Sequence, residues 1–596
     1  MKEIDLRINA LRKEMINRGL DAYIIPSSDA HQSEYVHDHW KSREWISGFT
    51  GSAGIVVITK DHAGLWTDSR YFLQAEEELS DCQMVLHKQG IPHAPEHTGW
   101  LKDQLKEGSK VGLDGSLFSL NQIQHLNSQL TTKQIVIETN HDLIAQVRKD
   151  RPALPDNPIF EHSIKYAGKS RSEKLTQIRR EMHTQGVEYH LITTLDDIAW
   201  IFNIRGDDIE FNPLAIAYAV IGPDKTWLFI DEIKVSPELT ACLLKDTILL
   251  KPYGHIRAFL MELPKEQKIL INPATISVFL ADLLTSGQIK KGPTLSTKLK
   301  AIKNSTEIAC LRQTMVKDGV ALVKLYRWLE TQVQSGSVKE TEVAEQLAAF
   351  RKLQSRYRGE SFSAIVGYKG NGAIVHYRPL PQSCAAIKNE GILLLDSGGQ
   401  YEDGTTDITR TTAFGTPTSE QKQNFTLVLK GHIAIADLIF PKGTKGIQID
   451  AMARQPLWKY HLNYGHGTGH GVGFFLNVHE GPQGFSISVA RAGAAFEPGM
   501  ITSNEPGFYK QGEYGIRIEN LLLCVEDKKS DYGDFLKFES LSLFPIDQQL
   551  IEKELLTHTE INWLNNYHQE VLNKLSPHLN QEEQNWLKTQ CQIIQT

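Results

Sequence analysis

The sequence predicts two α/β domains followed by an α+β domain and a helical C-terminal tail. Its 596 residues exceed what one hydrophobic core can serve, so the chain should divide into about three or four domains. A helix–turn–strand pattern near the N-terminus returns at 175–194. From about residue 360 short strands alternate with glycine-rich turns, and after Pro545 the pattern is helical again. These changes place the domains at 1–153, 154–296, 297–545 and 546–596.

The composition is that of a globular protein, with 41% hydrophobic and 23% charged residues. The net charge of −7 provides no basic field to hold nucleic acid, and no apolar run approaches the length of a membrane span. The charged residues 1–18 lack the apolar core of a signal peptide. Six scattered cysteines without a CxxC pair are typical of reduced thiols in a cytoplasmic protein. We therefore expect a cytoplasmic protein with no nucleic-acid partner and no membrane partner.

The repeated N-terminal pattern consists of an amphipathic helix, a glycine that ends the helix, and a buried strand. In the first copy Gly19 precedes the apolar strand 22–26, and the helix before it has apolar residues at Ile4, Ile8, Leu11 and Met15. In the second copy Gly186 precedes the strand 189–193, and the helix before it has apolar residues at Leu175, Ile178 and Met182. We interpret the pattern as one α/β domain present twice, with the boundary in the proline cluster Pro152, Pro155 and Pro158.

A long amphipathic helix opens the third domain and runs from Ile308 to Leu329. Gly319 lies on its apolar face, where glycine weakens the helix and indicates a close contact with another element. In the tail, one helix face collects Leu564, Tyr567, Val571 and Leu575. We expect this tail to serve packing or a subunit contact.

Glycine occupies every second position of the segment from Tyr464 to Gly473. In an extended strand successive side chains point to opposite faces, so one face here would be bare backbone. A bare face lets another backbone approach closely. The opposite face would carry His466, Thr468 and His470. The alternative is a flexible glycine loop.

Two aspartates are predicted to meet on a hairpin. Asp396 ends an apolar strand, and Asp407 lies in a β-branched one, with the turn signal Asp403-Gly404 between them. A hairpin centred on residues 401 and 402 places the two carboxylates roughly opposite each other on one face. Like charges so placed repel unless a cation lies between them. The alternative, that both carboxylates are solvated, fits poorly with their apolar flanks.

Two glutamates complete an inventory of metal-binding groups. Glu505 is held between Asn504 and a Pro-Gly pair, and Glu519 lies in the segment 515–520. Each alone would be an ordinary surface acid. Together with His470 and the two aspartates they provide four carboxylates and one imidazole, which match the charge of two divalent cations. Oxygen-rich ligation with one imidazole favours Mn²⁺ or a similar ion, and a metal pair can polarise a carbonyl and activate water.

The sequence resembles the proline-specific aminopeptidases of the pita-bread metallopeptidase family, in their three-domain cytosolic form. The resemblance runs over almost the full length. It rests on the segments 25–35, 66–72, 376–379, 395–399, 406–411, 465–471, 477–482, 504–507, 515–520 and 563–567. It implies two creatinase-like α/β N-terminal domains, a pita-bread catalytic domain, and a protein that is commonly a homodimer.

The resemblance also implies roles for individual residues. Asp396 would bind one metal through both oxygens, and Asp407 and Glu519 would bridge two metals. His470 and Glu505 would complete the second site, with Glu505 also accepting a proton from the attacking water. The residues expected at the substrate are His376 and His479 around the proline, His466 beside them, and Arg70 and Arg517.

The function implied is removal of the N-terminal residue from peptides with proline in second position, by a hydroxide activated between two divalent metals, most readily Mn²⁺. A prolidase, which cuts only dipeptides, and a non-catalytic pita-bread binding protein are the alternatives. The two large N-terminal domains disfavour the first, and the complete ligand set disfavours the second. Which histidine protonates the departing proline nitrogen stays open.

Overall fold

The computed structural model describes residues 3–91 and 93–595. The chain forms two compact units. The first comprises residues 1–162 and 169–296, and the second comprises residues 163–168 and 297–596. The finer domain limits predicted from the sequence remain predictions.

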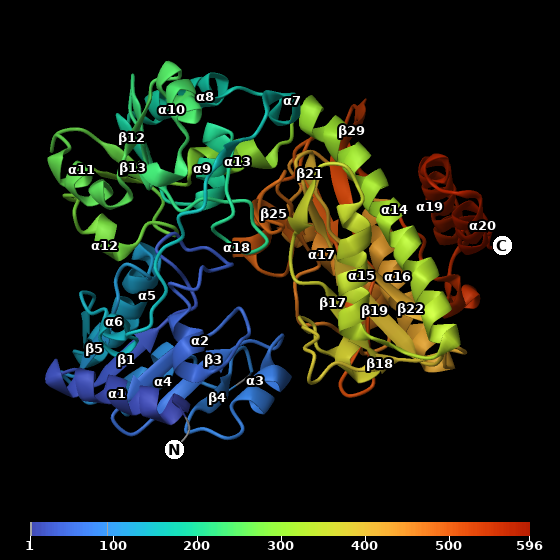
Figure 1. Ribbon diagram of the computed structural model, residues 1–596, viewed down its shortest axis with the longest axis horizontal. Helices are drawn as coiled ribbons and strands as arrows, with labels where there is room; N and C mark the ends of the chain where they lie inside the picture. The colour runs from blue at the N-terminus through green and yellow to red at the C-terminus, as the bar shows by residue number, and fades with distance from the viewer. Residues whose placement is uncertain (1–2, 92, 596) are drawn as a thin grey trace. The chain divides into compact units, whose positions relative to one another are not determined.

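The first unit contains two six-stranded sheets with the same topology (Figure 1). The strands of one sheet, in the order β4-β3-β2-β1-β5-β6, are Val85–Lys88, Ala63–Thr67, Ile55–Thr59, Ala22–Ile25, Lys110–Leu113 and Val136–Glu138. Those of the other, in the order β12-β11-β10-β8-β13-β14, are Ile248–Lys251, Thr226–Phe229, Tyr218–Ile221, Tyr189–Ile192, Ile269–Ile271 and Ile289–Lys291. In both, the central strand is antiparallel to one neighbour and parallel to the other. The prediction of one α/β domain present twice is confirmed.

The helices that precede the two central strands end as the sequence predicts. Helix α1 (Glu3–Asn17) buries Ile8, Leu11 and Met15, and helix α8 (Arg171–Gln185) buries Leu175, Ile178 and Met182. Gly19 and Gly186 follow with φ of 66° and 64°, the left-handed conformation that glycine adopts without a steric penalty.

The second unit contains two sheets and a hairpin that position the candidate site, besides the smaller sheets β16-β20-β21 and β15-β18. A three-stranded sheet, in the order β17-β19-β22, consists of Ile365–Tyr368, Ile392–Ser397 and Ile408–Ala413. A six-stranded sheet, in the order β23-β30-β29-β26-β24-β25, consists of Ile439–Pro441, Gly533–Ser540, Asn520–Ser530, Ile501–Asn504, Gly469–Gly471 and Glu480–Phe485. The hairpin pairs β27 (Gly507–Lys510) with β28 (Tyr514–Arg517).

Four long helices of the second unit accompany these sheets: α14 (Ser305–Ser335), α15 (Glu340–Lys352), α16 (Ser419–Ala436) and α17 (Gly446–Trp458). Figure 1 shows α14, α15 and α16 beside β17, β19 and β22. A Cβ atom at Gly319 of α14 would lie 2.4 Å from the carbonyl oxygen of Leu543, so the predicted close contact is confirmed. The tail helix α19 (His558–Leu575) packs Leu564 and Val571 into the same core.

The register of the aspartate hairpin differs from the prediction by two residues. Asp396 is opposite Thr409, and the tight turn consists of residues 402 and 403. Asp407 immediately precedes β22, two positions from the residue that faces Asp396. In extended backbone this spacing puts it on the same side as Asp396 and diagonal to it. The pattern of alternation was sufficient to predict the face, whereas long-range packing sets the register.

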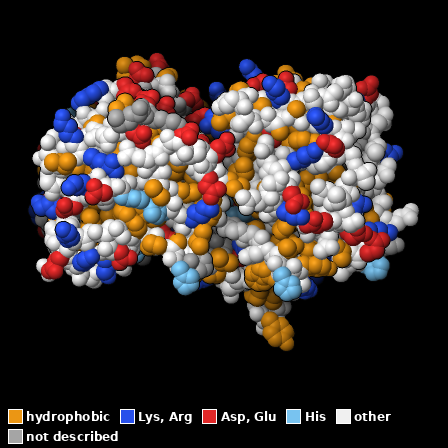
Figure 2. Space-filling view, turned by 90° about the horizontal axis from the view of Figure 1, so that it is seen from below, with side chains coloured by type: hydrophobic (Ala, Val, Ile, Leu, Met, Phe, Trp, Pro, Cys, Tyr) orange, Lys and Arg blue, Asp and Glu red, His pale blue; other side chains and the backbone are white. Residues whose placement is uncertain are grey.

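On the face seen in Figure 2, Lys and Arg side chains are interspersed with Asp and Glu. Among residues 3–91 and 93–595, none of the helices combines the length and the apolar composition that crossing a bilayer requires.

Candidate metal centre

The glycine-rich segment is held between two neighbouring strands. Only Gly469–Gly471 is a strand, β24, which is shorter than the sequence predicts. A Cβ atom at Gly469 would lie 1.9 Å from the carbonyl oxygen of Ser503, and one at Gly471 would lie 2.2 Å from that of Glu480. Both contacts are to backbone, so no side chain fits at either position. The close backbone approach predicted for the bare face is present, which contradicts the flexible-loop alternative for β24.

An ion pair on α17 fixes the residues that precede β24. The Arg454 guanidinium donates to the carbonyl oxygens of Tyr464 and His466, each at 2.8 Å. Asp450 accepts a 2.6 Å hydrogen bond from the Thr468 hydroxyl and also binds Arg454. The pair is buried and satisfies backbone groups that a glycine-rich segment cannot pair internally.

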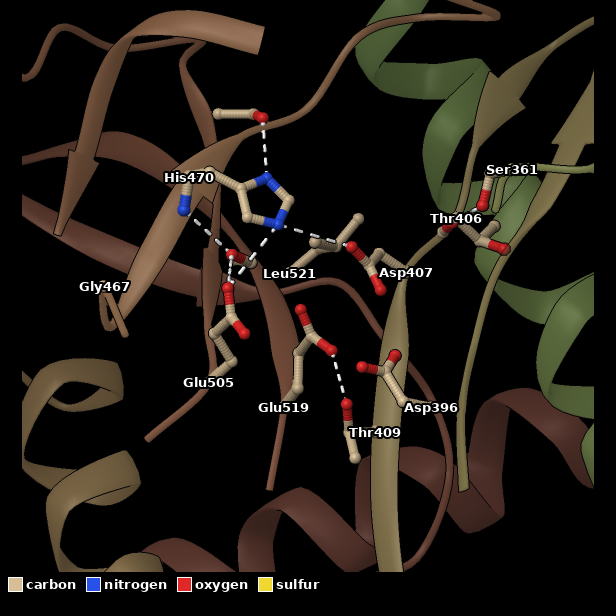
Figure 3. Close-up of polar contacts among 12 residues, drawn as sticks. Ser361, Asp396, Thr406, Asp407, Thr409, Gly467, His470, Glu505, Glu519 and Leu521 are labelled. Atoms are coloured by element: carbon tan, nitrogen blue, oxygen red, sulfur yellow. Dashed lines mark hydrogen bonds and ion pairs between the residues drawn. The ribbon is translucent and has the colours of Figure 1, made fainter. Parts of the chain in front are cut away.

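The predicted ligands come from separate elements and converge (Figure 3). Ligand atoms of Asp407, His470 and Glu519 all lie within 4.8 Å of one another. The Nε2 atom of His470 is 3.6 Å from Asp407 Oδ2 and 3.5 Å from Glu505 Oε1. Asp396, the last residue but one of β19, lies beside this group, and Thr409 Oγ1 donates to Glu519 Oε2 at 2.7 Å.

The buried carboxylates destabilise one another. Burial raises the pKa of Asp407 and of Glu519 well above the usual range, and repulsion from the neighbouring carboxylates raises both further. Burial also raises the pKa of Glu505 to about 7, although the positive charge of Arg517 opposes this shift. Asp396 Oδ1 is buried and has no hydrogen-bond partner among the residues that the structure describes. Divalent cations would neutralise this cluster, and its donor set of oxygens with one imidazole fits them.

The three histidines predicted to lie at the substrate have different surroundings in the structure. The His479 ring packs edge-on against His470, with ring centroids 4.2 Å apart. The Nε2 atom of His466 is 2.8 Å from the Tyr509 hydroxyl. His376 lies half-buried in the segment after the 3₁₀ helix η4 (Lys369–Ala373).

Arg517 lies against a predicted ligand. Its guanidinium donates to Asp396 Oδ2 at 2.6 Å and to the Tyr509 hydroxyl at 2.7 Å, and the side chain is 2% exposed. The contacts of Arg517 therefore orient Asp396, and its role towards the substrate remains a prediction. Tyr509, which joins Arg517 to His466, was missed because no sequence pattern marks it. Thr409 could have been found, because it lies two residues after Asp407 in a strand.

Arg70 belongs to the first unit, where it forms a bidentate ion pair with Asp68 at 2.7 and 2.8 Å. If Arg70 also contacts the substrate, we expect Arg70→Ala to reduce peptide turnover while metal content stays unchanged. Asp68→Asn is the matched control, because it removes the ion pair and keeps the arginine. Normal kinetics in Arg70→Ala, with a stability change of about 1 kcal/mol or less, would show that the residue serves only the ion pair.

The chain matches the models of four family domains. Metallopeptidase family M24 covers residues 309–526, the creatinase/prolidase N-terminal domain covers 7–149 and again 150–307, and the C-terminal region of peptidase M24 covers 534–594.

Relatives match over nearly the whole chain. The probable Xaa-Pro aminopeptidase P of Laccaria bicolor is 42% identical, over 98% of this chain and 93% of its own. Aminopeptidase P2 of Arabidopsis thaliana is 40% identical, over 98% of this chain and 88% of its own. The crystal structure of X-prolyl aminopeptidase from Caenorhabditis elegans, described as a cytosolic enzyme with a di-nuclear active site, superposes with a TM-score of 0.95 at 34% identity. That likeness covers 100% of both chains.

Proposed function

Because this chain belongs to metallopeptidase family M24, we propose that it is an Xaa-Pro aminopeptidase that releases the N-terminal residue from peptides with proline in second position. The observation that carries the proposal is the full-length likeness to X-prolyl aminopeptidase, which includes both N-terminal domains. A prolidase remains the second candidate, and the full-length likeness to aminopeptidases disfavours it. The buried carboxylate cluster disfavours a non-catalytic binding protein.

The residues that would hold two divalent cations are Asp396, Asp407, His470, Glu505 and Glu519. The oxygen-rich donor set favours Mn²⁺. When bound, such a pair supplies Lewis-acid polarisation of a carbonyl and lowers the pKa of water. The orphaned Asp396 Oδ1 and the mutual repulsion of the other carboxylates support this assignment.

The residues of the chain would move the protons of the reaction. Glu505 lies beside His470 in the cluster, where its carboxylate could accept a proton from water. The Xaa-Pro bond is a tertiary amide without an N–H, so its recognition must rest on the carbonyl and on the proline ring. The departing proline nitrogen still requires a proton, and a histidine beside the cluster such as His479 can stabilise or donate it. We also propose a cytoplasmic homodimer, on the resemblance to the family.

The test is a panel of Xaa-Pro, Xaa-Pro-Yaa and Xaa-Ala-Yaa peptides incubated with the purified protein and Mn²⁺. Cleavage of Xaa-Pro-Yaa, with release of the first residue and little activity on Xaa-Ala-Yaa, is expected. Cleavage of Xaa-Pro alone would indicate a prolidase. No hydrolysis with two equivalents of metal bound would favour the binding protein.

A further inference from the structure

One buried carboxylate, Glu340, lies at the start of α15 and faces the segment that carries His376. Its four hydrogen-bond donors all belong to residues 368–385 rather than to its own helix. The bonds are Tyr368 N to Oε1 at 2.7 Å, Asn371 Nδ2 to both oxygens at 3.1 Å, Tyr377 Oη to Oε2 at 2.8 Å, and Ala385 N to Oε2 at 2.7 Å. Glu340 is 0% exposed.

These bonds hold the segment at both ends and beside the histidine. Tyr368 ends β17, and Ala385 immediately precedes β18 (Ala386–Ile387), so one carboxylate joins the two ends of the connection. Tyr377 is the residue next to His376. After η4 the connection has no regular structure until β18, so its backbone depends on such anchors.

The connection is joined to two elements that lie at the metal centre, the strand β17 and the hairpin of β27 and β28. Ile365 of β17 is opposite Asp396 of β19. A Cβ atom at Gly515 of β28 would lie 1.7 Å from the carbonyl oxygen of Gly372, so the start of the connection touches the hairpin that ends in Arg517. A shift of the connection therefore changes where His376 lies relative to the cluster.

A carboxylate is suited to this position because it accepts at both oxygens and donates at none. The four donors are uncharged groups, and hydrogen bonds to a charged acceptor contribute more than neutral ones. In glutamine, the amide nitrogen would face donors instead of accepting from them. Replacing Glu340 with glutamine therefore keeps the shape of the side chain but removes the hydrogen bonds accepted by at least one of its two oxygens.

We propose that Glu340 is a positioning residue for His376, which it fixes against the metal centre through Tyr377 and the two ends of the connection. This inference rests on the proposed function and on the role that the family resemblance implies for His376, which is contact with the substrate around the proline. An ordinary helix N-terminal glutamate would favour the helix through its charge alone. Glu342, in the same first turn, instead caps its own helix, since it accepts from the backbone N–H of Lys339 at 2.7 Å.

The experiment compares Glu340→Gln with Glu342→Gln, each alone and combined with His376→Ala, in the metal-loaded protein. We expect Glu340→Gln to lower turnover of an Xaa-Pro-Yaa peptide by about 10²-fold, because a misplacement of about 1 Å can have that effect. Metal content should not change, and Glu342→Gln should be near wild type. In the His376→Ala background the loss from Glu340→Gln should shrink to less than about 2-fold, because residues that act through each other are not additive.

Equal losses from Glu340→Gln with and without His376, or a loss of metal, would overturn the proposal. If Glu340→Gln does not fold, Tyr377→Phe removes one of the bonds and leaves the carboxylate, and the same non-additivity with His376→Ala is expected. Hydrogen–deuterium exchange of 368–385 is a separate readout, since the amides of Tyr368 and Ala385 should exchange faster in Glu340→Gln alone. Unchanged exchange overturns the anchoring, whereas an inactive wild-type protein with faster exchange in the variant would overturn only the proposed function.

Discussion

Replacing Asp407 with asparagine is expected to remove metal from both sites and to lower turnover by about 10³-fold or more, because metal stabilisation of the transition state amounts to several kcal/mol. The carboxylate lies within 4.8 Å of ligand atoms of both His470 and Glu519. Asparagine keeps the volume but supplies a neutral amide, which is a weak ligand. Metal content by elemental analysis and turnover of an Xaa-Pro-Yaa peptide measure the result.

The fold should survive this change, and the pKa of Asp407 gives the reason. A carboxyl whose pKa is raised in the folded state lowers the stability of the protein as pH rises above the unfolded-state pKa of about 3.8, because the unfolded chain then releases the proton more readily. With metal removed by a chelator near neutral pH, Asp407→Asn should therefore unfold at the same temperature as wild type or higher.

Asp403→Asn is the matched control. Asp403 is a buried aspartate of the same hairpin that binds Lys317 at 2.5 Å and Arg356 at 2.7 Å. The Asp403→Asn protein should lose stability and keep its metals. An Asp407→Asn protein that retains two equivalents of metal and full turnover would rule out a bridging role for Asp407.

Exchanging His479 for phenylalanine is expected to lower turnover by about 10²–10⁴-fold, the usual contribution of general acid–base catalysis, with both metals still bound. Phenylalanine still places an aromatic ring against His470, but this ring cannot carry a proton. Turnover and metal content, measured on the same preparation, test this prediction.

The same exchange at His470 should instead weaken metal binding, because its Nε2 faces Asp407 and Glu505. The two variants are each other's control, since the rings are in contact and the substitution is identical. If the His479 variant lost metal while the His470 variant kept it, the division into ligand and substrate histidines would be wrong.

Much of the fold and the candidate ligand set could be predicted from the sequence, because these features depend on residues that are close together in the chain. Helical spacing in the two N-terminal helices and the glycines that end them predicted a repeated α/β domain. Alternation around Asp396 and Asp407 predicted that both face one side of the ladder. The alternating glycines of 465–473 predicted a close backbone approach, and Gly469 and Gly471 have it.

The tertiary structure alone decided what depends on contacts between distant residues. It set the hairpin register, brought His470 to Asp407 and Glu519, and buried Arg517 against Asp396. Burial and the proximity of like charges raise the pKa of Glu505, and neither is visible in the residues around it. Local patterns report which face a side chain occupies. Which partner faces it is decided by packing across the core, where one shift moves every contact along the strand.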